Sequence, residues 1–135
     1  MTKLTAIALT TVLGLAFAAS AQDAKPAAPT LPPASTKTGV TFATDIKPIF
    51  DAACVKCHGD TKPRAGVVLN SLEATLKGGT DGKILTVGDS TKGSLVNAVA
   101  HIGDSGTFMP KGAGAKPLTP EQIGLIRAWI DQGAK

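Results

Sequence analysis

The sequence predicts a small all-α domain made of short helices that are joined by glycine-rich loops. Apolar residues recur at helical spacing in four separate stretches. No stretch long enough for a β-strand alternates apolar and polar side chains. The chain of 135 residues also contains 15 glycines and 9 prolines, which favour turns between short elements. Together these observations predict helices and loops without a sheet.

The first predicted helix ends at the most informative motif of the chain. Ile46, Ile49, Phe50 and Ala53 follow the i, i+3, i+4, i+7 spacing of one helix face. Pro48 fits the first turn of this helix, where a backbone N–H has no partner within the helix. The apolar face therefore leads directly into the residues that follow Ala53.

Two short helices are predicted in the middle of the chain. The first covers Leu72–Lys77, with Ser71 as the N-cap and Gly78 at the end. The second covers about residues 94–100, which contain three apolar residues at helical spacing. Glycine-rich loops separate both helices from their neighbours.

The last helix has the clearest signals. Thr119 is the predicted N-cap, Pro120 is at the first helical position, and Gln122 completes a capping box. Gly133 should end the helix. Trp129 could contact a cofactor edge, but we favour a position in the protein core. The apolar face of this helix consists of Ile123, Ile126, Trp129 and Ile130.

The motif after the first helix is C-x-x-C-H, formed by Cys54, Cys57 and His58. This spacing is typical of c-type haem attachment. Its two thiols can bond to the two vinyl groups of one porphyrin, and the adjacent imidazole can bind the iron. A bound His58 should donate its second ring N–H to an acceptor, for which we expect a backbone carbonyl among residues 60–66. The motif therefore predicts one covalent haem c.

Two other chemistries use a C-x-x-C pair, a thioredoxin-like dithiol and a zinc site. A structural zinc site needs a full tetrahedral set of ligands, whereas the chain has only two cysteines and two histidines. A thioredoxin-like pair is expected next to a βαβ pattern, which the sequence lacks. Both alternatives therefore explain the sequence less well than haem attachment.

Met109 is the candidate for the second axial ligand of the iron. It is the only methionine besides Met1, and it lies in a loop that Pro110 should stiffen. A thioether ligand stabilises ferrous iron and raises the reduction potential, which suits electron transfer. His101 is the competing ligand, and it would lower the potential. The plainer alternatives are a core position for Met109 and a partly exposed helix-end position for His101, stabilised by the helix dipole.

Residues 1–21 have the features of a secretory signal peptide. Lys3 supplies the positive end, residues 4–18 are mostly apolar and small, and Ala19-Ser20-Ala21 is an A-x-A cleavage site. The apolar run is short for a transmembrane helix, and an uncleaved anchor is the alternative. No cysteine stands at the cleavage site, so a lipid anchor is not indicated. We expect cleavage after Ala21, export to the periplasm and no stable membrane insertion.

The rest of the sequence divides into a linker, residues 22–40, and one domain, residues 41–135. The linker has four prolines among alanine, threonine and serine, so we expect it to be extended and mobile. The domain is large enough for one small core. Aromatic residues make up only 4% of the chain, so a buried haem would supply missing apolar mass. We therefore expect the haem-free chain to fold poorly.

The domain as a whole resembles a known family. The most specific matching residues are the haem motif, Met109-Pro110 and the closing Trp129-Ile130 and Gly133-Ala134. The sequence is similar to the planctomycete-type cytochrome c domain, a branch of the single-haem class I cytochromes, over about residues 41–134. The other matching positions are Phe42, Asp45-Ile46-Lys47-Pro48-Ile49-Phe50, Arg64-Ala65-Gly66, Leu69, Ser71-Leu72, Gly78-Gly79, Gly88-Asp89, Ser94-Leu95, Leu118-Thr119 and Ile126.

The resemblance implies a class I cytochrome c fold with His58 and Met109 as axial ligands. An iron with both ligands in place is six-coordinate and low-spin, which suits an electron carrier with redox partner proteins rather than an enzyme. Two alternatives stay open, a peroxidase-like haem enzyme and a gas-binding sensor, and both need an open sixth position on the iron. His101 is the only histidine left as a distal acid or base for the enzyme.

The net charge of +4 and the isoelectric point near 9.2 bear on the partners. Lys56 lies inside the motif and Lys111 follows Met109-Pro110, so both could surround an exposed haem edge and attract an acidic redox partner. An ordinary solvated surface is the alternative. No basic run is interleaved with aromatic residues, so we expect no nucleic-acid binding. We expect a monomer.

Overall fold

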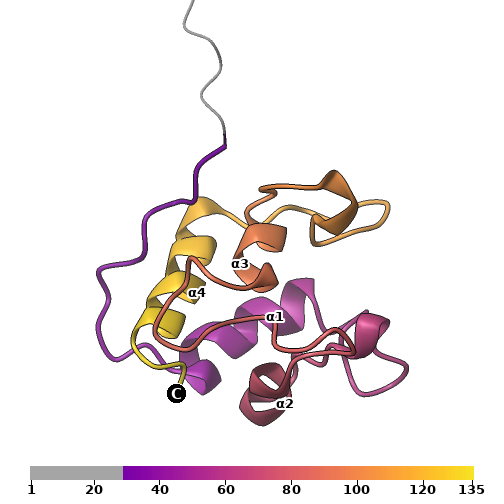
Figure 1. Ribbon diagram of the computed structural model, residues 1–135, viewed down its shortest axis with the longest axis horizontal. Helices are drawn as coiled ribbons and strands as arrows, with labels where there is room; N and C mark the ends of the chain where they lie inside the picture. Colours follow the sequence, from indigo (N-terminus) through magenta and orange to yellow (C-terminus); the bar gives the residue numbers. More distant parts are fainter. Residues whose placement is uncertain (1–28) are drawn as a thin grey trace, which may run out of the picture.

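The protein is described here by a computed structural model that covers residues 29–135. The predicted signal peptide, residues 1–21, and the first part of the linker lie outside the described residues. Within residues 29–135 the backbone forms helices and loops but no sheet, which confirms the all-α class. In chain order, the elements are η1 (Phe42–Ile46), α1 (Lys47–Ala53), η2 (Arg64–Gly66), α2 (Leu72–Lys77), α3 (Ser94–Val99), η3 (Ser105–Thr107) and α4 (Pro120–Asp131) (Figure 1).

The predicted helices are present, and their ends follow the local capping residues. The Ser71 side chain accepts a hydrogen bond from Ala74 N at the start of α2. At α4, Thr119 N donates to Gln122 Oε1 at 2.9 Å and Gln122 N donates to Thr119 Oγ1 at 3.3 Å, so the capping box forms as predicted. Both helices therefore begin where the sequence indicates.

Two helices differ from their predicted bounds. The first begins earlier than expected, because the wider π-helical turn η1 runs directly into α1. Thr41 caps this turn, and Thr41 N donates to Asp45 Oδ2 at 2.9 Å. The third helix ends at Val99 rather than Ala100, and the left-handed φ of 55° at His101 turns the chain away soon afterwards.

The core lies where η1 and α1 pack against α4. Phe42 contacts Trp129 at a centroid distance of 5.8 Å and Phe50 at 6.1 Å. Trp129 is fully buried, and its Nε1 donates to the carbonyl of Lys135 at 3.0 Å. Phe42 N donates to the same carbonyl at 2.7 Å, so residues that follow α4 lie against η1. The predicted core position of Trp129 is confirmed.

Residues 31–40, called the N-terminal strap below, lie along α4 (Figure 1). Ser35 N donates to Gly124 O at 2.9 Å, and Gln132 Nε2 donates to Lys37 O at 2.7 Å. Val40 at the end of the strap is buried in the core. This part of the linker is extended as expected, but it is bound to the domain rather than free.

Two α4 residues explain why the strap binds. Gly124 leaves room for it, since a Cβ atom there would lie only 2.7 Å from Pro33 O. Arg127 donates from Nη1 to Pro32 O and from Nε to Ser90 Oγ at 3.0 Å. A composition rich in proline and alanine gave no sign of these contacts, because the partner residues lie in a helix far along the chain.

Candidate functional site

The C-x-x-C-H residues form a tight turn directly after α1. Cys54 caps the helix, and Cys57 N and His58 N both donate to Cys54 O, at 3.0 Å and 2.9 Å. Cys54 is buried and Cys57 is half-buried, and both are free thiols. The local backbone geometry therefore brings the two thiols and the imidazole of the motif to one place.

The environment of Cys54 argues against a reactive dithiol. Burial raises the pKa of the Cys54 thiol to about 11. Thioredoxin-like cysteines act as thiolates and need a lowered pKa. Among residues 29–135, no three or more His, Cys, Asp or Glu side chains are close enough together to hold a metal ion.

A cavity of about 370 Å³ opens beside this turn. All four predicted site residues, Cys54, Cys57, His58 and Met109, line it. Its volume falls within the range of roughly 300–1,000 Å³ that is usual for ligand and cofactor pockets. The apolar residues of its wall include Val67, Leu69, Ile84, Leu95 and Val99.

His58 is held in one ring orientation. Its Nδ1 lies 3.2 Å from Val67 O, and its carbonyl accepts from Leu69 N at 2.8 Å. Since a carbonyl can only accept, the proton of the neutral ring is on Nδ1, and Nε2 is left with a lone pair for a metal. We had predicted an acceptor among residues 60–66. The acceptor in the structure, Val67, is one residue beyond that range.

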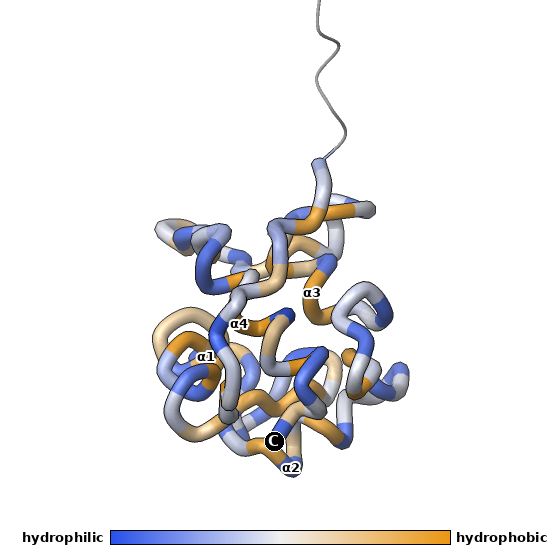
Figure 2. The backbone as a smooth tube through the Cα atoms, turned by 90° about the vertical axis from the view of Figure 1, so that its left-hand side faces the viewer, coloured by the Kyte–Doolittle hydropathy of each residue, from blue (hydrophilic) through white to orange (hydrophobic). Residues whose placement is uncertain are grey.

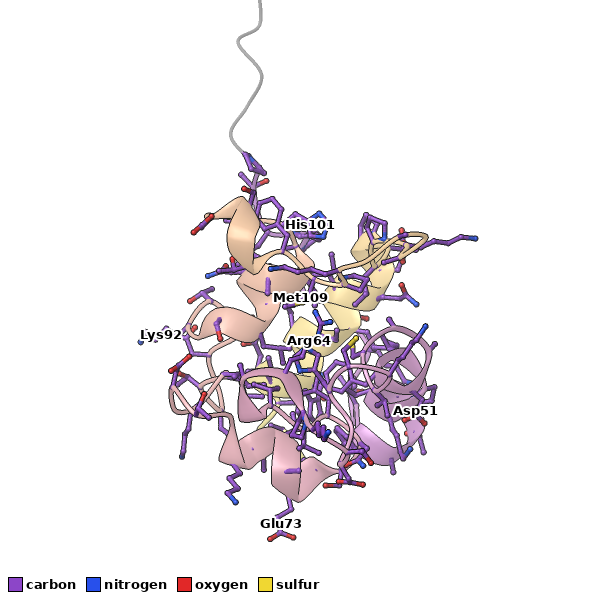
Figure 3. The ribbon with its side chains drawn as sticks, turned by 90° about the vertical axis from the view of Figure 1, so that its right-hand side faces the viewer. Asp51, Arg64, Glu73, Lys92, His101 and Met109 are labelled. Carbon is purple, nitrogen blue, oxygen red and sulfur yellow. The ribbon has the colours of Figure 1, made fainter. Side chains whose placement is uncertain are left out.

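Met109 comes to the cavity from a different part of the chain. Met109 N donates to Ala98 O at 3.0 Å, which ties the loop to the end of α3. The side chain is half-buried and lines the cavity. Figure 3 shows Met109 between His101 and Arg64. The long gap in sequence between Met109 and the motif is therefore closed by the fold.

His101, the competing ligand, is outside the residues that line the cavity. Its Nε2 lies 2.9 Å from Met109 O, and its ring stacks on Phe108. The imidazole is thus engaged by the Met109 loop. This arrangement does not favour His101 as an iron ligand.

Charged residues that the sequence analysis did not single out also line the cavity. Arg64 lies six residues after His58 and had been considered only as a position that matches the family, and Asp81 and Lys83 lie in the loop after α2. Lys111, which had been singled out, is at the cavity, whereas Lys56 is exposed and outside its lining. An arginine spaced closely after the motif was the available signal for a charged group near the site.

Residues 54–112 match the family described as Planctomycete cytochrome C. This stretch, less than half of the chain, is similar to a planctomycete-type cytochrome c domain. The match starts at the first cysteine of the motif and ends just after Met109, so it includes every predicted site residue. It confirms the resemblance and indicates a haem-binding electron-transfer domain that uses haem c. No curated protein and no solved structure matches the chain.

The residues at the cavity fit the haem that a cytochrome c domain implies. An apolar wall suits a porphyrin, and thiol, imidazole and thioether are the groups that hold a c-type haem and its iron. The cationic side chains of Arg64, Lys83 and Lys111 suit the carboxylates of such a cofactor. In residues 29–135, no helix of this cytochrome c domain is long and apolar enough to cross a bilayer.

Proposed function

We propose that this chain is a periplasmic mono-haem cytochrome c that carries single electrons between redox partners. Cys54 and Cys57 bind the haem, and His58 and Met109 are the axial ligands of its iron. The fold is that of a class I cytochrome c over residues 41–135, exported by a signal peptide that is cleaved after Ala21. The observation that supports this most strongly is that Met109 and the motif residues line one cavity.

The bound haem supplies the one-electron chemistry. The protein residues supply a fixed ligand set: Val67 O orients the ring of His58, and Ala98 O holds the backbone of Met109. The apolar residues of the wall, among them Val67, Leu69 and Leu95, would limit the water around the bound haem, so less solvent would reorganise when its charge changes. Such a site favours fast electron exchange over substrate conversion.

The partners that we propose are acidic redox proteins. Arg64, Lys83 and Lys111 place positive charge at the cavity, and the whole chain carries a formal charge of +4. Complementary charge raises the rate of encounter more than the final affinity. The protein acts as a monomer in this proposal, without nucleic acid and without stable membrane insertion.

The first test is the absorption spectrum of the ferric, haem-loaded protein and its Met109→Ala variant. The parent should be low-spin with the weak far-red band of methionine-to-iron ligation. Met109→Ala should lose that band, become high-spin or bind an external ligand, and have a lower reduction potential. Leu125→Ala, at a half-buried α4 residue outside the cavity, is the control and should keep the parent spectrum.

The result also separates the proposed carrier from the two other haem functions. A high-spin parent protein would mean an open iron site, and a peroxidase-like enzyme or a gas sensor would then be the better account. An unchanged low-spin spectrum in Met109→Ala would show that Met109 is not the ligand.

A further inference from the structure

We propose that His101 is a positioning residue that fixes the Met109 loop, so that the methionine sulfur stays at the iron. The proposal rests on the ligation by Met109 proposed above. His101 Nε2 lies 2.9 Å from Met109 O. A carbonyl oxygen has no proton to give, so the imidazole is the donor in this hydrogen bond.

The same ring holds the residue before Met109. The rings of His101 and Phe108 are stacked with centroids 4.8 Å apart and an interplanar angle of 2°. One side chain therefore contacts two consecutive loop residues, one by a hydrogen bond and one by its face. Figure 3 shows His101 beyond Met109, on the side away from Arg64.

His101 is itself fixed to the end of α3. Its N–H donates to Ala98 O at 3.3 Å, and the next residue, Ile102, donates to Asn97 O at 2.9 Å. Met109 N also donates to Ala98 O, at 3.0 Å. The backbone of Met109 is therefore attached to α3 in two ways. Its N–H is hydrogen-bonded to α3 directly, and its carbonyl is hydrogen-bonded to His101, which is itself bonded to α3.

Most other hydrogen bonds of the loop are internal to it: Asp104 accepts from Gly106 N and from the Thr107 hydroxyl, and Lys111 Nζ donates to Gly106 O, so they do not attach the loop to α3. None of residues 101–117 is buried, although the half-buried Met109 packs against the core. A hydrogen bond and a ring stack are then a large part of what opposes release of the loop. Any external iron ligand must compete with the loop, and its apparent affinity rises with the fraction of protein in which the loop is released.

The experiment uses the haem-loaded full chain and imidazole as the external ligand. His101→Phe keeps an aromatic ring for Phe108 but removes the donor, and His101→Gln keeps a donor but removes the ring. Losing one hydrogen bond should raise the apparent imidazole affinity by about two- to tenfold. His101→Phe should also shift or weaken the far-red band and lower the reduction potential, and His101→Gln should restore part of the imidazole resistance.

Asp104→Ala is the matched control, because Asp104 Oδ1 accepts a hydrogen bond from Gly106 N at 2.8 Å in the same loop, and the hydrogen bonds of Met109 go to Ala98 and His101 instead. It should change imidazole affinity less than His101→Phe does. If His101→Phe keeps the parent imidazole affinity and far-red band while Met109→Ala loses that band, the inference about His101 is wrong. If Met109→Ala itself leaves the spectrum unchanged, the ligation by Met109 fails instead.

Discussion

The two sides of this domain are held together differently. On the α1–α4 side, the protein supplies its own packing: Phe50, Trp129 and Ile130 are fully buried, and the strap covers α4. On the cavity side, residues 101–117 contain no buried residue, and the loop is fixed mainly by hydrogen bonds to the end of α3. Figure 2 shows strongly hydrophobic segments at α3 and near α1 and α4, with hydrophilic segments in the loops.

The difference indicates which side depends on the cofactor. The chain has few aromatic residues, and three of them, Phe42, Phe50 and Trp129, pack together on the α1–α4 side. The other side surrounds a cavity of about 370 Å³, and apolar walls without a filling group lose the dispersion contacts that packing normally gives. A bound haem would complete that side, so its removal should affect the two sides unequally.

The largest expected effect is that of removing the haem attachment. The Cys54→Ala, Cys57→Ala double variant should lose the cooperative thermal transition of the haem-loaded protein. Any remaining hydrogen-exchange protection should be strongest in α1 and α4, because the largest fully buried side chains, among them Phe50, Ile126 and Trp129, lie there. A cooperative transition with uniform protection in the double variant would contradict the proposed difference between the sides.

A medium effect is expected where the strap meets α4. Alanine normally stabilises a helix relative to glycine by about 1 kcal/mol. At Gly124 the sign should be reversed, since the added Cβ would lie 2.7 Å from Pro33 O. We expect Gly124→Ala to lower the free energy of unfolding by about 1–3 kcal/mol, as overpacking usually does, and to raise hydrogen exchange in the strap.

The haem spectrum is the internal control for Gly124→Ala. Gly124 is outside the cavity lining, so the absorption bands and the reduction potential should stay at their parent values. A spectral change as large as that of Met109→Ala would mean that the two sides are not independent.

The smallest expected effect is a pH dependence at the strap. Hydrogen bonds from Lys37, and then from Thr41 N and the Thr44 hydroxyl, lower the pKa of Asp45 from 3.8 to about 2. A lowered folded-state pKa stabilises the protein above pH 3.8, and this contribution is lost as the pH falls from about 4 towards 2. Denaturant unfolding at pH 5 and pH 2.5 should show a smaller loss of stability in Asp45→Asn than in the parent.

The parent and Asp45→Asn have the same haem ligands, so any acid sensitivity of the ligands affects both equally. The difference between their unfolding free energies at each pH therefore isolates the contribution of Asp45. An equal loss of stability in both would show that Asp45 is not the group that titrates. The spectrum should change in parallel in the two, because Asp45 lies outside the cavity lining.

What the sequence predicted correctly was encoded locally. The capping residues Ser71 and Thr119 start α2 and α4 within a few positions of themselves, and the motif forms its turn from adjacent residues. The sequence indicated Met109 as an iron ligand only because no other methionine besides Met1 was available and because the domain resembles a known family. The fold confirms that it shares a cavity with His58, while its ligation is still a prediction.

The features that sequence reasoning missed depend on distant contacts or unusual backbone angles. The strap lacks an apolar period, and its hydrogen-bond partners lie on or just after α4. The hydrogen bond from His101 to Met109 needs the positive φ of 55° at His101, which a non-glycine residue rarely adopts. Neither property can be read from composition or spacing.

The contacts of the strap also set an order of events during folding. Pro32 is bonded to a residue 95 positions away, Lys37 to another 95 away, and Val40 to one 92 away. Contacts of such separation require closure of a loop that spans almost the whole domain, which slows their formation. Because the strap and α4 lie at opposite ends of the domain sequence, the best-packed side of the molecule can assemble only when everything between them is present.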